Sequence, residues 1–308
     1  MKRVWIICVM AVLTLLLGGC TINQPAEADG HLNIVTSFYP IYIATSNIID
    51  GAENVSLQCL ASPDVGCLHD YQLTVKDMIT LETADIFVIN GGGAESFLDK
   101  AVSAYPDLIV INASDEILEE FIHREEEEGL LEEHSHEDEE NSHIWVSVSL
   151  YIEEVKNISK KLIEYNPENA DLYASNTEAY ISRLESLGNE MHQGLTSISK
   201  RNIVTFHEAF DYFAEEYDLN IVAVVEREPG TSPSASELAE IIDLVRANDV
   251  SAIFTELQYS KSAAITIANE TGVPVYELDP VVTGAFEKDA YEKAMRNNLD
   301  VLLEALGE

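Results

Sequence analysis

The stretch ENADLYASNTEAYISRLESLGNEMHQGLTSI runs from Glu168 to Ile198 and decides the fold. It contains no proline, and Gly188 and Gly194 are its only glycines. Large apolar side chains recur through it at spacings of three, four and seven: Tyr173, Tyr180, Leu184, Leu187, Met191, Leu195 and Ile198. Such spacings place these side chains on one face of an α-helix. The stretch therefore predicts a single amphipathic helix, roughly 45 Å long at about 1.5 Å of rise per residue.

Short runs rich in β-forming residues lie on both sides of this helix. Before it they occupy Leu32–Thr36, Val55–Leu60, Asp85–Asn90 and Leu108–Ile111, and after it Asn202–Thr205, Ile221–Val225, Ala252–Thr255 and Pro274–Glu277. Helical patterns separate the runs, and two of them open with the capping pairs Thr74 with Asp77 and Ser234 with Glu237. Alternation of strands and helices predicts parallel sheets covered by helices. We therefore expect an α/β protein of two α/β lobes, bridged by one long α-helix.

The boundaries of these parts follow from the same patterns. A second helix is expected over Ser147–Glu164, and Pro167 separates it from the long one. We therefore expect an N-terminal α/β lobe over residues 31–165, a connecting helix over 166–199 and a C-terminal α/β lobe over 200–308.

The first twenty residues have the pattern of an export signal. Lys2 and Arg3 precede the apolar run Val4–Leu17, and small residues then lead to Cys20. A run this short with these flanks indicates a secretory signal rather than a spanning helix. We expect a signal peptide over 1–19, a lipidated Cys20 and a polar tether through residue 30. The protein would then lie outside the cytoplasm, anchored to the bacterial cell membrane by lipid.

The charge of the chain is strongly negative, at −38. This balance argues against nucleic acid as a partner, because phosphate contacts need clustered Lys and Arg. Part of the charge lies in an acidic segment over 123–142, where EEHSHEDEEN contains His134 and His136. The segment has too few apolar residues to offset the cost of ordering, so it predicts a mobile loop. We interpret the loop as an auxiliary metal-gathering site, with a purely solubilising insert as the alternative.

Three histidines and one aspartate lie in loops or near the carboxyl ends of predicted strands: His69, His143, His207 and Asp279. In open α/β sheets the carboxyl ends of the strands face the ligand crevice. Imidazole and carboxylate are ligands that Zn²⁺ accepts. These residue types at these places predict a metal site.

Four motifs then resemble one known family, the zinc/manganese-type substrate-binding proteins of bacterial ABC importers. They are His69-Asp70-Tyr71-Gln72-Leu73-Thr74, His143-Ile144-Trp145, the segment Phe206–Phe213 around His207, and Leu278-Asp279-Pro280. The resemblance covers essentially the whole chain after the tether. It implies that His69, His143, His207 and Asp279 bind the metal in the cleft between the lobes. The family often continues the second motif as Leu-Asp-Pro, whereas this chain has Val146-Ser147-Val148.

The third ligand position bears on which metal is bound. Members of the manganese type tend to carry glutamate there, and Mn²⁺ favours oxygen-rich sites. His207 gives three imidazoles and one carboxylate, which suits tetrahedral zinc. Some zinc-binding members place a glutamate before the first histidine, where this chain has Leu68, so Asp279 is the expected fourth ligand, with a water as the alternative. We expect Zn²⁺ as the transported ligand, and Mn²⁺ as the alternative.

Two cysteines remain after Cys8 leaves with the signal and Cys20 takes lipid. They are Cys59 and Cys67, and such a pair can oxidise outside the cytoplasm. We expect a disulfide that fixes the loop carrying His69. The alternatives are two reduced thiols, or Cys67 as a thiolate ligand.

Two other classes of protein are rivals to a metal carrier. A zinc enzyme is disfavoured because His207-Glu208 leads to Asp211 and not to the second histidine of an H-E-x-x-H helix. An adhesin on the cell surface stays open as an alternative or added role. We expect a monomeric metal-binding lipoprotein without enzymatic activity, whose partner is the permease of an ABC importer.

Overall fold

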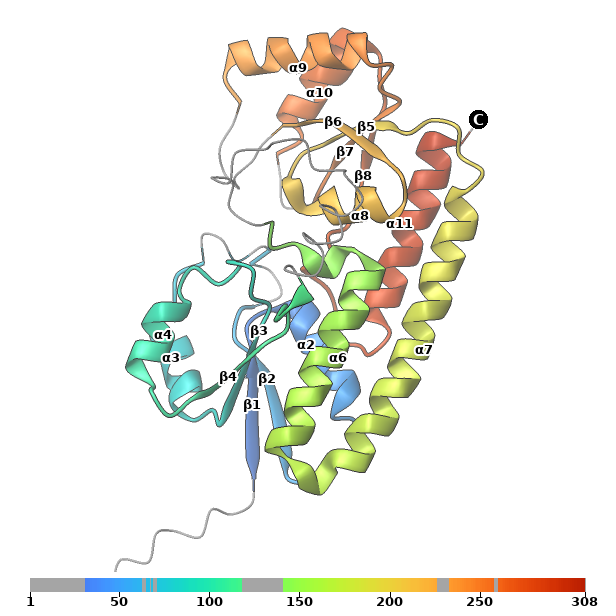
Figure 1. The fold of residues 1–308 in the computed structure, drawn as a ribbon. Helices are drawn as coiled ribbons and strands as arrows, with labels where there is room; N and C mark the ends of the chain where they lie inside the picture. Colours follow the sequence, from blue (N-terminus) through green and yellow to red (C-terminus); the bar gives the residue numbers. More distant parts are fainter. Residues whose placement is uncertain are drawn as a thin grey trace, which may run out of the picture. The chain divides into compact units, whose positions relative to one another are not determined.

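The first lobe is built on a four-stranded parallel sheet (Figure 1). The structure is a computed structural model that describes residues 31–62, 65–66, 68, 71–117, 141–225, 233–257 and 260–307. The strands are β1 (Leu32–Thr36), β2 (Val55–Cys59), β3 (Ile86–Ile89) and β4 (Ile109–Asn112), in the order β2-β1-β3-β4. The helices of this lobe are α2 (Tyr39–Ile48), α3 (Val75–Glu82) and α4 (Leu98–Ala104). Thr74 and Asp77 form the predicted capping box of α3.

The second lobe repeats the arrangement of the first sheet. Its strands are β5 (Asn202–Thr205), β6 (Asn220–Val224), β7 (Ala252–Thr255) and β8 (Val275–Glu277), all parallel and in the order β6-β5-β7-β8. Its helices are η3 (Glu208–Phe210), α8 (Asp211–Glu216), α9 (Ala235–Ala247) and α10 (Ser262–Thr271). Every strand expected from the sequence is present, and no strand end differs by more than one residue from its expected position. The prediction of two parallel α/β lobes is confirmed.

The long helix predicted between the lobes is α7, which spans Ala170–Leu195. It is shorter than expected, because its first residues belong to the turn η2 (Pro167–Asn169) and it ends before Ile198. The apolar face that predicted it is buried from Tyr173 to Leu195. Two helices pack along α7: α6 (Val148–Tyr165), preceded by the turn η1 (Ile144–Val146), and α11 (Ala290–Leu306). Figure 1 shows α7 and α11 running beside both lobes.

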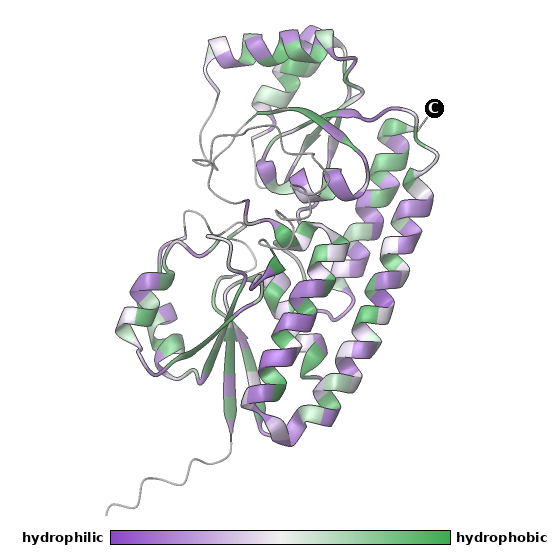
Figure 2. Ribbon diagram, viewed as in Figure 1, coloured by the Kyte–Doolittle hydropathy of each residue, from purple (hydrophilic) through white to green (hydrophobic). Residues whose placement is uncertain are grey.

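One hydrophobic core extends through both lobes. It joins the first sheet and the faces of α6, α7 and α11 to residues of the second lobe such as Phe210, Phe213 and Phe254. A separate cluster lies in the second lobe between its sheet and α9 and α10, around Ile241 and Ile253. Figure 2 shows the apolar strands of both sheets and the two-faced colouring of the long helices. The lobes therefore share one hydrophobic core and are not two separately packed units joined only by α7.

The segment between β8 and α11 returns to the first lobe, which the sequence did not predict. Trp145 donates from Nε1 to the Pro280 carbonyl at 2.7 Å, and the Tyr291 hydroxyl donates to the Trp145 carbonyl at 2.8 Å. Farther along this segment, the Tyr39 hydroxyl donates to the Ala285 carbonyl at 2.6 Å. The lobes are therefore linked by α7 and, in addition, by these hydrogen bonds, of which the two at Trp145 are buried.

The segment Val146-Ser147-Val148, where the family often has Leu-Asp-Pro, forms the start of helix α6. Ser147 is the N-cap of α6, and its hydroxyl accepts a hydrogen bond from the Leu150 amide at 3.2 Å. The same hydroxyl donates at 2.7 Å to Glu216 Oε2, a carboxylate of the second lobe that also accepts from the Ser149 amide. A carboxylate near a helix N-terminus is stabilised by the helix dipole. Helix α6 is therefore capped partly from its own lobe and partly from the other.

We expect Ser147→Ala to destabilise the protein by about 1 kcal/mol, the usual cost of losing an N-cap hydroxyl. Thermal unfolding in the presence of a chelator measures the effect. Ser147→Thr is the matched control, because it keeps a hydroxyl that can both cap the helix and reach Glu216. Equal melting temperatures for the Ala variant and the wild type would contradict this account of the helix start.

Candidate metal site between the lobes

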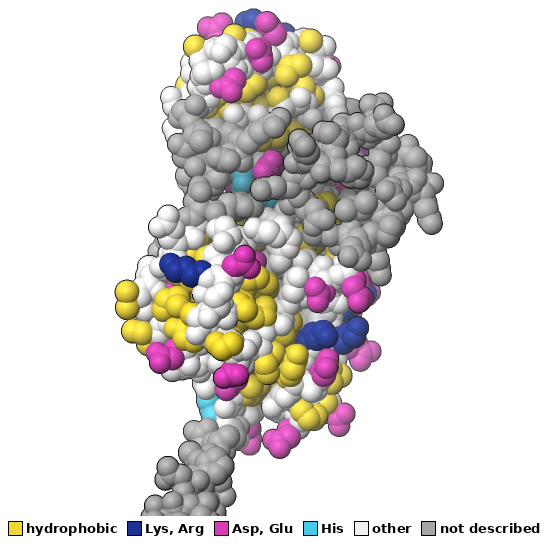
Figure 3. All heavy atoms as spheres, turned by 60° about the vertical axis from the view of Figure 1, so that its left-hand side comes forward, with side chains coloured by type: hydrophobic (Ala, Val, Ile, Leu, Met, Phe, Trp, Pro, Cys, Tyr) yellow, Lys and Arg dark blue, Asp and Glu magenta, His cyan; other side chains and the backbone are white. Residues whose placement is uncertain are grey.

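His143 and His207 come from different lobes and meet face to edge. Their ring centroids lie 4.5 Å apart with the planes at 89°, and each residue is only 1% exposed. His143 directly precedes η1, and His207 follows β5 by one residue and precedes η3. Figure 3 shows histidine surface between the two lobes. Two of the predicted ligands are thus brought together, 64 positions apart in the chain (207 − 143).

The orientation of His143 is set by Asn141. The His143 ring Nδ1 lies 2.8 Å from Asn141 Oδ1, which also accepts the His143 amide at 3.0 Å. Because a carbonyl oxygen can only accept, Nδ1 carries the proton and Nε2 keeps its lone pair for a metal. Asn141 is itself held by the second lobe, since its Nδ2 donates to the Glu208 carbonyl at 2.7 Å and to Asp211 Oδ2 at 2.9 Å.

The residue beside His207 was missed by the sequence analysis. Glu256 Oε1 lies 3.7 Å from His207 Nδ1, and Glu256 is 2% exposed. Burial raises the pKa of Glu256, the neighbouring His207 lowers it, and the charge of Asp279 raises it. A signal was available, because Glu256 directly follows the predicted strand Ala252–Thr255 and therefore lies at the crevice end of the sheet.

Asp279 lies at the same end of the second sheet, two residues after β8. Its Oδ1 accepts the Val281 amide at 2.8 Å, and its backbone is held at both amide and carbonyl by the Asn298 side chain. Burial raises the pKa of the Asp279 carboxyl, and the charge of Glu277 adds to this effect. Asp279 also borders a small hollow of about 80 Å³ that Leu257 helps to line.

Several predicted residues lie outside the described part of the chain: Cys20, Cys67, His69, His134 and His136. Cys59 is described and carries a free thiol, whose Sγ donates to the Ala61 carbonyl at 3.2 Å. The disulfide between Cys59 and Cys67 therefore stays a prediction. Among the described residues, no three His, Cys, Asp or Glu side chains are grouped closely enough to hold a metal ion. The described ranges also contain no helix that is long and apolar enough to cross a membrane.

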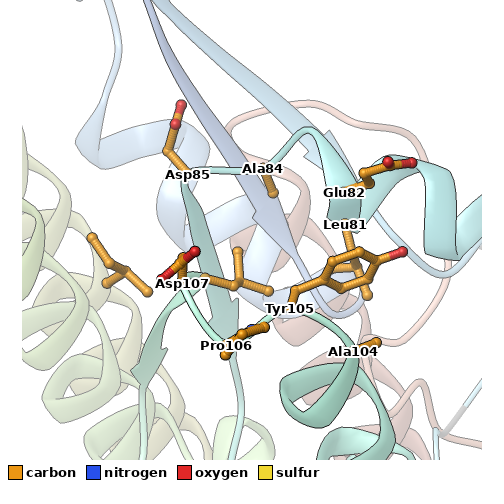
Figure 4. Close-up of a pocket in the computed structure, with 10 residues that line it drawn as sticks. Leu81, Glu82, Ala84, Asp85, Ala104, Tyr105, Pro106 and Asp107 are labelled. Carbon is orange, nitrogen blue, oxygen red and sulfur yellow. The ribbon is translucent and has the colours of Figure 1, made fainter. Parts of the chain in front are cut away.

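A larger hollow of about 480 Å³ lies at the opposite end of the first sheet (Figure 4). It is bordered by the residues that precede β3 and β4, including Asp85, Tyr105 and Asp107. The Tyr105 hydroxyl is engaged with the Met78 carbonyl at 2.6 Å. Because the amino ends of parallel strands do not face the ligand crevice, we assign this hollow no part in metal binding.

The sequence profile of the periplasmic component A of the zinc-uptake complex, ZnuA, matches residues 34–305. The chain belongs to the ZnuA family. The match spans both sheets and all three long helices, so the resemblance inferred from the four motifs is confirmed at the level of the family.

Named relatives of this ZnuA family chain include proteins that bind zinc and one that binds manganese. Zinc-binding lipoprotein AdcA of Streptococcus pneumoniae is 31% identical over 98% of this chain, which spans 60% of the length of AdcA. The high-affinity zinc uptake system protein ZnuA of Bacillus subtilis is 30% identical, over 97% of this chain and 96% of its own length. Manganese-binding lipoprotein MntA of Halalkalibacterium halodurans is 28% identical over the full length of both chains.

Solved structures of similar fold carry different metals and roles in their descriptions. The substrate-binding protein FpvC of Pseudomonas aeruginosa, solved with Ni²⁺ and with Mn²⁺, has a TM-score of 0.76 and 29% identity, over 90% of this chain and 97–98% of its own. The laminin-binding protein Lmb of Streptococcus agalactiae, described as bifunctional in adhesion and metal transport, has a TM-score of 0.75 and 27% identity, over 89% of this chain and 99% of its own. The ZnuA family chain thus shares its fold with metal-binding proteins of several specificities.

Proposed function

We propose that this protein captures Zn²⁺ outside the cytoplasm and delivers it to the permease of an ABC importer. The observation that carries the proposal is the meeting of His143 and His207 across the two lobes. Both rings are buried, and the contact of the first ring's Nδ1 with Asn141 makes Nε2 the nitrogen that would bind a metal. We further propose that His69 and Asp279 complete the ligand set, and that the protein acts as a monomeric carrier and not as an enzyme.

Zinc is favoured over manganese by the chemistry of this donor set. Three imidazole nitrogens and one carboxylate match the tetrahedral sites of Zn²⁺, whereas Mn²⁺ prefers more oxygen donors. The zinc relatives AdcA and ZnuA support the assignment, and MntA keeps manganese as the alternative cargo.

The proposal also gives a role to the lipid anchor at Cys20 and to the acidic loop that contains His134 and His136. We place a diacylated cysteine at Cys20, which holds the protein at the outer face of the cell membrane. We assign His134 and His136 to weak, fast-exchanging metal capture that raises the zinc concentration near the main site. The description of Lmb favours adhesion as a second candidate role.

Growth under zinc limitation tests the proposal directly. We expect a strain that lacks the gene to stop growing in a zinc chelator and to recover on added Zn²⁺, but not on added Mn²⁺. Complementation with the wild-type gene should restore growth, the His207→Ala gene should not, and deletion of residues 125–141 should restore it only partly. Cys20→Ser should release the protein into the medium. If the strain that lacks the gene grew normally under zinc limitation but adhered less to host matrix, the protein would be an adhesin and not a zinc carrier.

A further inference from the structure

Glu256 and His207 occupy matching places at the ends of neighbouring strands. β5 and β7 are hydrogen-bonded in register, with Thr205 opposite Phe254, so continuing the register by two residues puts His207 opposite Glu256. These two strands are the central pair in the order β6-β5-β7-β8, where the direction of winding changes. Ligands of open α/β sheets bind outside the carboxyl ends of the strands at this switch point. The topology therefore places the Glu256 carboxylate at the predicted metal site.

The Glu256 carboxylate is buried and, within the ranges that the structure describes, has few partners apart from His207. It is 2% exposed, and its Oε1 has no hydrogen-bond partner in the described part of the chain. His207 is the only ion-pair partner recorded for it among the described residues. Burying a carboxylate with one oxygen unpartnered costs free energy, which His207 offsets in part and the charge of Asp279 increases. Because burying Glu256 costs stability, we look for the role of this residue in its effect on His207.

We propose that Glu256 is the positioning residue of His207, whose Nδ1–H it accepts so that Nε2 is presented to the metal. The proposal rests on the metal-binding function proposed above. The 3.7 Å separation is longer than a hydrogen bond, and we expect a small rotation of the ring to close it. The two histidines are then oriented differently: a neutral amide, Asn141, holds His143, whereas a carboxylate holds His207 and makes it the more basic ligand.

Zinc affinity and the tautomer of His207 test the proposal together. Purified wild type, Glu256→Gln, Glu256→Leu and Glu256→Asp are titrated with Zn²⁺ in competition with a chromophoric chelator. Loss of an outer partner of a ligating histidine typically weakens metal binding by about 10–100-fold, which we expect for the Leu variant. The Gln variant should fall between Leu and wild type, because its carbonyl still accepts a proton but carries no charge. The Asp variant should recover part of the loss.

The second readout is one that a merely structural role would not change. In zinc-free protein labelled with ¹⁵N-histidine, the His207 ring of the wild type should show a proton on Nδ1. The Leu variant should show a mixture of tautomers. Glu154→Gln is the matched control, because Glu154 is also a buried glutamate but lies on α6, outside the proposed site. It should keep the wild-type zinc affinity and the His207 spectrum.

Failure of this inference can be separated from failure of the proposed function. If Glu256→Leu binds zinc within twofold of wild type and keeps the Nδ1–H tautomer, the positioning role is wrong. If His207→Ala also binds zinc as tightly as wild type, the metal site itself is misplaced. Loss of zinc binding in His207→Ala with no effect in the Glu256 variants would overturn only the role of Glu256.

Discussion

Zinc should raise the melting temperature of the wild type by on the order of 10 °C, and His207→Ala should remove most of that shift. A ligand that binds only the folded state stabilises it by about 4 kcal/mol at a thousandfold excess over its dissociation constant. Removing the His207 imidazole eliminates the nitrogen ligand that the second lobe contributes to the proposed site. His143→Ala should behave alike, and Asp279→Ala should lose less, because a water can take a carboxylate position. Differential scanning fluorimetry with zinc and with chelator measures the effect.

His192→Ala is the control for this experiment. His192 lies on the exposed side of α7, with its Nε2 3.9 Å from Glu216 and its ring 4.8 Å from that of Tyr217. The variant can therefore lower the melting temperature slightly, but it should keep the full shift produced by zinc. A His207→Ala protein that retained one tightly bound zinc per chain would show that the ligand assignment is wrong.

The second large effect concerns pH and a glutamate far from solvent. Glu154 on α6 is 0% exposed, and neither carboxylate oxygen has a hydrogen-bond partner within the described ranges. Burial raises its pKa well above the usual value, and the charge of Glu95 raises it further. The phenols of Tyr151 and Tyr291 are also electrostatically coupled to it. The folded protein therefore holds a proton on Glu154 at pH values where the unfolded chain has released it.

The sign of the pH effect follows from this difference in proton binding. The contribution of Glu154 to stability is greatest below the pKa of glutamate in the unfolded chain, about 4.3, and it falls as pH rises toward the folded-state pKa, by about 1.4 kcal/mol per pH unit. Glu154→Gln removes this loss. Its melting temperature should match the wild type near pH 4 and exceed it increasingly between pH 5 and pH 7. The exposed neighbour Glu153→Gln should show no such divergence, and parallel melting curves for Glu154→Gln and wild type would refute the assignment.

Much of the fold was predictable because it depends on local patterns. The apolar spacing from Tyr173 to Leu195 specified α7, and the capping boxes at Thr74 and Ser234 marked the starts of α3 and α9. The eight strands followed from short apolar runs between turns. Each of these patterns involves residues of one helix or strand, so it can be recognised in the sequence without knowledge of tertiary contacts.

The features that were missed depend on residues from different elements. Glu256, Asn141 and Glu216 look like ordinary polar residues. Glu256 gains its partner through the pairing of β5 with β7, and Asn141 and Glu216 gain theirs through the packing of one lobe on the other. The chain after Pro280 returns to the first lobe, and no hydrophobic pattern in that part of the sequence predicts this contact. Even the pairing of His143 with His207 required the resemblance to a family, because a histidine in a loop does not specify which strand end it will face.

The buried contacts between the lobes also bear on how fast a cargo can leave. Swinging the lobes apart would break the buried hydrogen bond from Trp145 Nε1 to the Pro280 carbonyl and would separate the rings of His143 and His207. We therefore expect dissociation to proceed through local displacement of the ligand-bearing segments and not through domain opening. Spontaneous release would then be slow, and a receiving permease would act as a catalyst of exchange by binding those segments in their displaced form.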